Sequence, residues 1–144
     1  MFDNLPFGPT RNRQVSFAES PRLRQVLEDY SDLVTQAEKE DIEGAYLLRK
    51  PLSDVEIFGP PESRVRNLAS ELSRFFFVEV YPYRGSTPER FSGTIFVSRF
   101  RTLPRLAADL INRSQWREDL QGVLYGKYDL TEVARYCQPL GLFK

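Results

Sequence analysis

The sequence contains no histidine and a single cysteine, Cys137. Without histidine, the chain cannot form a Ser-His-Asp triad or a Cys-His dyad. One thiol excludes an intramolecular disulfide and the usual zinc sites, which need several Cys or His ligands. No loop groups acids as a calcium site requires. We therefore expect no metal and no cofactor, and we interpret Cys137 as a buried, inert thiol in an apolar helical stripe.

Phosphate-binding motifs and long apolar runs are also missing. The sequence has neither G-x-x-x-x-G-K-[ST] nor G-x-G-x-x-G, so it predicts no nucleotide-binding loop of these kinds. Residues 1–17 have no signal-peptide pattern, and no apolar run is long enough to span a bilayer. We therefore expect a cytoplasmic protein that does not contact a membrane.

The net charge is zero, because Lys plus Arg and Asp plus Glu each total 20. Overall charge thus favours neither nucleic acid nor a cationic partner. The distribution is uneven, with eight acids against three bases from Ala18 to Glu43 and seven arginines against two acids from Arg84 to Arg117. Sixteen of the cations are arginine, which suits bidentate contacts to carboxylate or phosphate.

Aromatic and β-branched residues are concentrated between Phe75 and Arg101. This stretch predicts a hairpin of two strands, 75–83 and 91–101, whose short connection favours antiparallel pairing. Alternation along the strands separates two faces. The aliphatic face, which we predict to be core, carries Phe76, Val78, Val80, Ile95 and Val97. The mixed face carries Phe75, Phe77, Glu79, Tyr81, Thr94, Phe96, Ser98 and Phe100. This mixed face is either a second layer covered by helices or a surface for a ligand or partner.

The remaining chain predicts an extended or flexible arm at residues 1–19 and a single α+β domain at 20–144. A helix should start at Ser20-Pro21 and run to about residue 43. Short strands are expected at 45–49 and 55–58, followed by a helix that begins near Pro61. Three further helices should start at Thr102, near Trp116 and at Asp129. The order αββαββααα predicts a small antiparallel or mixed sheet with helices packed on it.

Two groups of side chains are candidates for binding. The first combines arginines with rings in and beyond the hairpin, an arrangement that serves protein interfaces or single-stranded nucleic acids. Its members are Arg84, Arg90, Phe96, Arg99, Arg101, Arg105, Tyr81, Tyr83, Tyr125 and Tyr128. The second is an acidic helical face, which is either simply solvated or a patch that binds a basic partner or imitates the charge of a nucleic acid. Its members are Glu28, Asp29, Asp32, Glu38, Glu40 and Asp41.

We expect from these features a small non-enzymatic protein-binding module, such as a regulator, adaptor or inhibitor. The small size and the lack of motifs suggest an origin in a phage or mobile element as a hypothesis. The partner would be another protein, including a second copy of this chain. The alternative is a single-stranded RNA or DNA binder that uses the hairpin. A small carboxylate-dependent enzyme is the least favoured hypothesis, with Glu79 as its candidate acid.

Overall fold

The structure is a computed structural model that describes residues 21–43 and 51–111. Its elements, in chain order, are α1 (Pro21–Asp29), α2 (Gln36–Glu43), β1 (Ser53–Phe58), α4 (Glu62–Leu72), β2 (Phe77–Pro82), β3 (Ser92–Ser98) and α5 (Leu103–Ile111). Several predicted features lie outside the described residues: the arm at 1–19, the Ser20 cap, the strand at 45–49, the helices starting near Trp116 and at Asp129, and Cys137.

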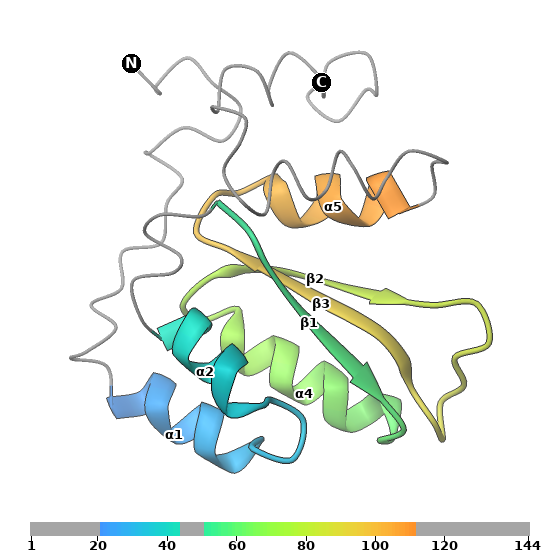
Figure 1. The fold of residues 1–144 in the computed structure, drawn as a ribbon, viewed down its shortest axis with the longest axis horizontal. Coiled ribbons are helices and arrows are strands. Elements are labelled where there is room, and N and C mark those ends of the chain that lie inside the picture. The colour runs from blue at the N-terminus through green and yellow to red at the C-terminus, as the bar shows by residue number, and fades with distance from the viewer. Residues whose placement is uncertain (1–20, 44–50, 112–144) are drawn as a thin grey trace.

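The described strands form one antiparallel sheet in the order β1-β3-β2. Helices α1, α2 and α4 lie on one face of this sheet, and α5 lies on the other (Figure 1). The predicted α+β class is confirmed. Because β3 pairs with both neighbours, it is the central strand among the described residues, and β1 and β2 are the outer strands of this part of the sheet.

The pairing register brings the predicted aliphatic residues onto the same face. Val78 is opposite Val97, and Val80 is opposite Ile95. Strand β1 adds Val55 to this face, opposite Ile95. On the central strand Ile95 and Val97 are fully buried, whereas Val78 and Val80 on the edge strand are partly buried. The face is therefore core, as predicted, but its burial decreases toward β2.

A layer of helices seals the aliphatic face. Leu23, Val26 and Leu27 of α1 and Val65, Leu68 and Leu72 of α4 belong to one buried cluster with the strand residues. Helix α4 begins where the sequence predicts, with Pro61 at its N-cap. Burying a branched or aromatic side chain of this size stabilises the fold by about 1.5–3 kcal/mol. This cluster is therefore the main source of stability in the described chain.

Helix α5 covers half of the mixed face. Phe96 and Ser98 are buried together with Leu103, Leu106 and Leu110 of this helix. The Ser98 hydroxyl donates to the Pro51 carbonyl and accepts a bond from the Phe100 N–H at 2.9 Å, so this buried polar group is satisfied. Thr102 occupies the predicted N-cap of α5, because its carbonyl accepts from the Leu106 N–H at 3.0 Å. The interpretation as a covered layer is therefore correct for this half.

The prediction of one continuous helix from residue 20 to about 43 is wrong. Helix α1 ends at Asp29, and α2 starts at Gln36 after a turn. The Thr35 hydroxyl accepts from the Glu38 N–H at 3.3 Å, and the Glu38 carboxylate accepts from the Thr35 N–H at 2.9 Å. This reciprocal capping box defines a new helix start. Leu33 and Val34 lie in the turn between the two helices and are buried. They therefore continue the apolar stripe of α1 across the break.

Both hairpin strands are shorter than predicted. The N–H groups of Phe75 and Phe76 donate to the Leu72 carbonyl at 2.9 and 3.0 Å, so these residues close helix α4 instead of starting a strand. At the other end, the chain leaves β3 after Ser98 and turns into α5. Within 77–82 and 92–98 the two faces keep their predicted residues, because the alternation there is unaffected, whereas Phe75, Phe76 and Phe100 lie outside the strands.

Candidate functional site

Beyond the cover of α5, the mixed face carries three neighbouring rings, which we name the aromatic corner: Phe58, Tyr81 and Tyr83. Phe58 is opposite Ser92 on one side of β3, and the Tyr83 N–H donates to the Ser92 carbonyl at 2.7 Å from the other side. The ring centroids of Phe58 and Tyr83 are 6.1 Å apart, and those of Tyr81 and Tyr83 are 5.9 Å apart. Residues far apart in sequence thus form one row of rings.

Phe58 is the exposed apolar end of the aromatic corner. Its side chain is 63% exposed, and within residues 21–43 and 51–111 it is the one large hydrophobic side chain on the surface. Phe58 is not among the predicted binding residues, although the alternation in Ser53–Phe58 places it on the same face as Asp54 and Glu56. That alternation is the signal that would have identified all three residues.

Hydrogen bonds hold the Tyr83 ring in place. Its hydroxyl donates to Glu56 Oε2 at 3.4 Å and shares a further hydrogen bond with the Thr94 hydroxyl. Burial raises the pKa of Tyr83, and the nearby Glu56 charge raises it further. The phenol therefore stays protonated at neutral pH and remains a donor. A ring fixed in this way presents a rigid surface beside Phe58.

Carboxylates border the rings on the same face. Glu56 is exposed, and Asp54 lies two residues earlier on β1, in register with Phe96. Glu79 is opposite Phe96 from the β2 side. Burial raises the pKa of Asp54, and the charge of Glu56 adds to this effect. The sheet surface between the predicted arginine groups is thus acidic.

The predicted arginines do not form one surface. Arg84 and Arg90 are exposed in the turn between β2 and β3, whereas Arg99, Arg101 and Arg105 follow β3 at its other end. The seven residues of β3 separate the two groups by about 20 Å at the usual rise of a strand.

The rings that were predicted to accompany these arginines do not form one surface either. Phe96 is 1% exposed beneath α5, so its ring presents no surface to a partner. Tyr125 and Tyr128 lie outside the described residues. Arg99 packs over the Phe100 ring at 5.1 Å, and burial lowers its pKa. Of the predicted ring residues, the structure brings together Tyr81 and Tyr83.

Several members of the predicted acidic patch form hydrogen bonds or ion pairs within the protein. Arg64 binds the Asp32 carboxylate, with Nε 3.2 Å from Oδ2, and this hydrogen bond lowers the pKa of Asp32. Asp29 accepts from Gln25 at 2.8 Å, and Glu38 caps α2. The other members are Glu28 and Glu40, which are exposed, and Asp41, which is partly buried. Because α1 and α2 are separate helices, these acids do not share one helical face.

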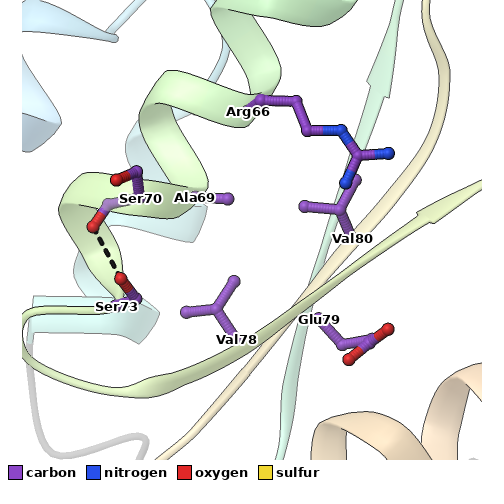
Figure 2. Close-up of a pocket in the computed structure, with 7 residues that line it drawn as sticks. All are labelled: Arg66, Ala69, Ser70, Ser73, Val78, Glu79 and Val80. Carbon is purple, nitrogen blue, oxygen red and sulfur yellow. Dashed lines mark hydrogen bonds between the residues drawn. The ribbon is translucent and has the colours of Figure 1, made fainter.

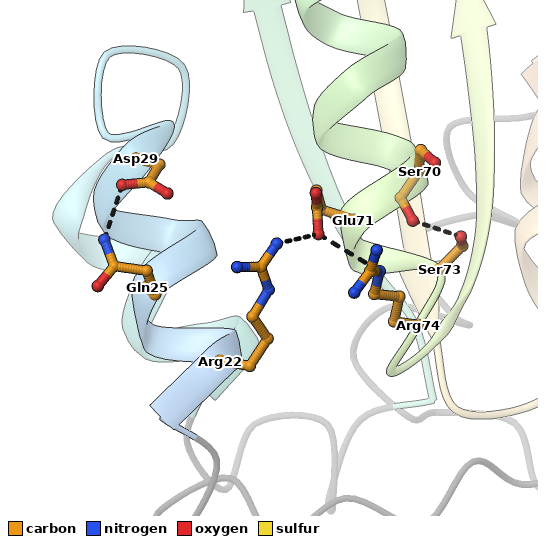
Figure 3. A network of polar contacts seen from close by, with 7 residues as sticks. All are labelled: Arg22, Gln25, Asp29, Ser70, Glu71, Ser73 and Arg74. Atoms are coloured by element: carbon orange, nitrogen blue, oxygen red, sulfur yellow. Dashed lines mark hydrogen bonds and ion pairs between the residues drawn. The ribbon is translucent and has the colours of Figure 1, made fainter.

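Ion pairs at both ends of α4 link it to α1 and to the turn that follows α1. Glu71 near the end of α4 accepts from Arg22 at 2.8 Å and lies 3.5 Å from Arg74 (Figure 3). At the opposite end of α4, Arg64 binds Asp32 and lies 4.9 Å from the centre of the Tyr30 ring. These arginines therefore support the helical layer.

An open groove runs between α4 and the edge strand β2. It has a volume of about 330 Å³, and its lining residues are Arg66, Ala69, Ser70, Ser73, Val78, Glu79 and Val80. Val78 and Val80 point toward α4, the Arg66 side chain extends toward Val80, and Glu79 points away (Figure 2). The Ser73 hydroxyl donates to the Ser70 carbonyl at 2.7 Å. The groove thus has an aliphatic floor with a cation at one end.

The described residues include no cluster of three or more potential metal ligands. No helix within the described ranges has the length and apolar character needed to cross a bilayer. Compared with known protein families, curated proteins and solved structures, the chain has no match.

Proposed function

We propose that this protein is a non-enzymatic binding module that recognises another protein through the aromatic corner. The exposed Phe58 ring beside the hydrogen-bonded Tyr83 carries this proposal. Aromatic side chains are enriched among the residues that dominate binding energy at protein interfaces. Because the ring row rests on a sheet, little conformational entropy remains to be lost when a partner binds.

The surroundings of the rings also support a protein partner. Glu56 lies beside the corner, and the exposed Arg84 directly follows Tyr83 in the chain. Exposed aromatic rings with polar and charged side chains beside them are typical of protein interfaces. A single-stranded nucleic acid would instead favour a continuous positive track along its backbone. Here Asp54, Glu56 and Glu79 lie on the face between the two arginine groups and would repel phosphates.

Site-specific photo-crosslinking in the native cell tests this proposal. A photoreactive amino acid replaces Phe58 in one variant and Asn67 in the control. Asn67 is exposed on α4, which lies on the opposite face of the sheet (Figure 1). We expect a discrete protein adduct from position 58 that position 67 does not give. Equal adducts from both positions, or adducts to nucleic acid alone, would contradict the proposal.

A substitution tests the energetic role of the ring. Phe58→Ala should weaken binding of the crosslinked partner by about 30-fold or more, the effect expected of a dominant interface residue. Because Phe58 is mostly exposed, the melting temperature should change little. Asn67→Ala is the matched surface control and should leave the affinity unchanged. An equal affinity of parent and Phe58→Ala would remove the aromatic corner from the interface.

A further inference from the structure

The main-chain groups of β2 alternate between β3 and the open side of the sheet. The Tyr83 N–H donates to the Ser92 carbonyl at 2.7 Å, which fixes the phase of the ladder. In an antiparallel pair the hydrogen-bonded residues alternate, so Tyr81 and Glu79 also direct their main-chain groups toward β3. Val78, Val80 and Pro82 consequently direct theirs away from the sheet.

Nothing in the described chain pairs with this outer side, since the strand order ends at β2. Pro82 fits the assignment, because a proline lacks an N–H and is tolerated where that group would point outward. The edge therefore offers the N–H and carbonyl groups of Val78 and Val80 and the carbonyl of Pro82. Strand β1, the opposite edge, carries Asp54 and Glu56, and charges of this kind discourage strand addition.

The groove beside β2 gives this edge a side-chain preference. A strand paired with β2 places every second side chain on the face of Val78 and Val80, which is the face of the groove. Ala69, Val78 and Val80 form an aliphatic floor that suits a branched apolar side chain. Arg66 lies at one end of it with its Nε 3.3 Å from Glu62, and its side chain is 52% exposed. A carboxylate two residues from the apolar side chain would reach this guanidinium.

We propose that the β2 edge accepts an extended segment of a partner protein as a fourth strand. The segment carries an aliphatic side chain for the groove and, two residues away, an acidic side chain for Arg66. Main-chain hydrogen bonds supply the affinity in this mode, and the pockets for alternate side chains supply specificity. The groove lies on the α4 face of the sheet and the aromatic corner on the other, so this site stands or fails independently of the first proposal.

A second copy of this chain fits the edge less well. Symmetric pairing centred on Val80 would place Val78 opposite Pro82 of the other copy, where the Val78 carbonyl finds no N–H. Centring on Glu79 would place two carboxylates directly opposite each other, which is unfavourable. Pairing at Val80 would also bring both copies of Arg66 toward the same point, since this side chain extends over Val80 (Figure 2). A segment with an acidic side chain avoids these conflicts.

Defined peptides test the side-chain preference. The probes are blocked, labelled heptapeptides with threonine at the odd positions. The even positions carry two valines and one glutamate, and the glutamate lies at the first of these positions in one peptide and at the last in the other. A matched set carries lysine in place of glutamate. By fluorescence anisotropy, we expect a glutamate peptide to bind at least tenfold more tightly than its lysine counterpart. Arg66→Ala should abolish this difference. Arg74→Ala, which removes an exposed arginine just beyond the C-terminal end of the same helix, should retain it.

Amide exchange tests the backbone pairing. In the free protein, the amides of Val78 and Val80 should exchange faster than that of Glu79, and saturating glutamate peptide should protect both. In the added strand, every second peptide amide faces β2. N-methylation of the amides that face β2 should abolish binding, whereas N-methylation of the amides that face solvent should leave binding intact. No binding at millimolar peptide, equal affinity for the glutamate and lysine probes, or binding without this protection would overturn the proposal. So would protection that increases with protein concentration alone, which would assign the edge to a second copy.

Discussion

Asp54 lies on β1 with its carboxyl partly withdrawn from water and the charge of Glu56 two residues away. Burial, followed by this charge, raises its pKa above the usual value of 3.8. The folded state therefore retains the proton more readily than the unfolded state. Stability linked to this proton is fully present below about pH 4 and is lost as the pH rises through the folded-state pKa.

The variant Asp54→Asn removes this titration with little change in shape. We expect it to melt at a higher temperature than the parent at pH 7 and to lose this advantage at pH 3. Thermal unfolding followed by circular dichroism at both values measures the effect. Glu28→Gln removes the same charge from an exposed position and should shift the melting temperature less. An advantage that is larger at pH 3 than at pH 7 would contradict the assigned direction.

Gly93 occupies a position on the central strand with no room for a side chain. A Cβ atom there would lie 2.3 Å from the Tyr81 carbonyl oxygen and 2.7 Å from Phe91 Cζ. Because one of these contacts is with backbone, the strands themselves would have to move. We expect Gly93→Ala to reduce the free energy of unfolding by about 1–3 kcal/mol, as overpacking usually does. An unchanged urea midpoint would show that β2 and β3 are less closely apposed at this position.

At the scale of elements, the capping box separates α1 from α2. Thr35→Ala removes the hydroxyl that accepts from the Glu38 N–H and should destabilise the protein by about 1 kcal/mol. Thr35→Ser keeps the hydroxyl and should cost less. Chemical denaturation of the two variants compares their free energies of unfolding. Equal stabilities would show that the cap does not hold the start of α2.

The position of a strand in the sheet determines how much a buried charge costs. Val97 is fully buried on the central strand, whereas Val78 is partly buried on the edge strand beside the open groove. We expect Val97→Asp to cost several kcal/mol, because the charge has no access to water there. Val78→Asp should cost less, since its carboxylate can reach solvent. Melting temperatures of the two variants test this order, and the reverse order would place β2 at the centre.

At the scale of the whole molecule, the separation of the two arginine groups predicts weak binding of nucleic acids. A labelled single strand should bind weakly and without sequence preference at low salt, and binding should vanish near physiological salt because few phosphates are neutralised. Arg99→Ala and Arg101→Ala should each change this weak binding only slightly. Titration by fluorescence anisotropy over a range of salt concentrations measures it. A tight, saturable complex at physiological salt would contradict the proposed protein-binding function.

Local sequence patterns predicted much of the fold. The absence of histidine and of a second cysteine excluded whole classes of catalytic and metal sites. Alternation within 77–82 and 92–98 defined both faces of the hairpin, because side-chain direction in a strand depends only on the period of two. Pro61 marked the start of α4 correctly. The break before Gln36 was missed, because the buried Leu33 and Val34 continue the helical stripe through the turn, although Thr35 and Glu38 have the spacing of a capping box.

The candidate sites depend on contacts between distant segments, which only the tertiary structure decided. Strand β1 pairs with β3, and this pairing makes β2 an edge and brings Phe58 to Tyr83. On the mixed face, which α5 packs against, Phe96 is buried, whereas Phe58 is mostly exposed. The sequence pattern of a strand shows which side chains share a face. Which strand it pairs with depends on the packing of both faces against neighbouring elements, and the pattern does not specify these neighbours. The sequence by itself therefore determined the faces of the strands, and the tertiary structure determined which parts of those faces and edges are left without a cover by the other described elements.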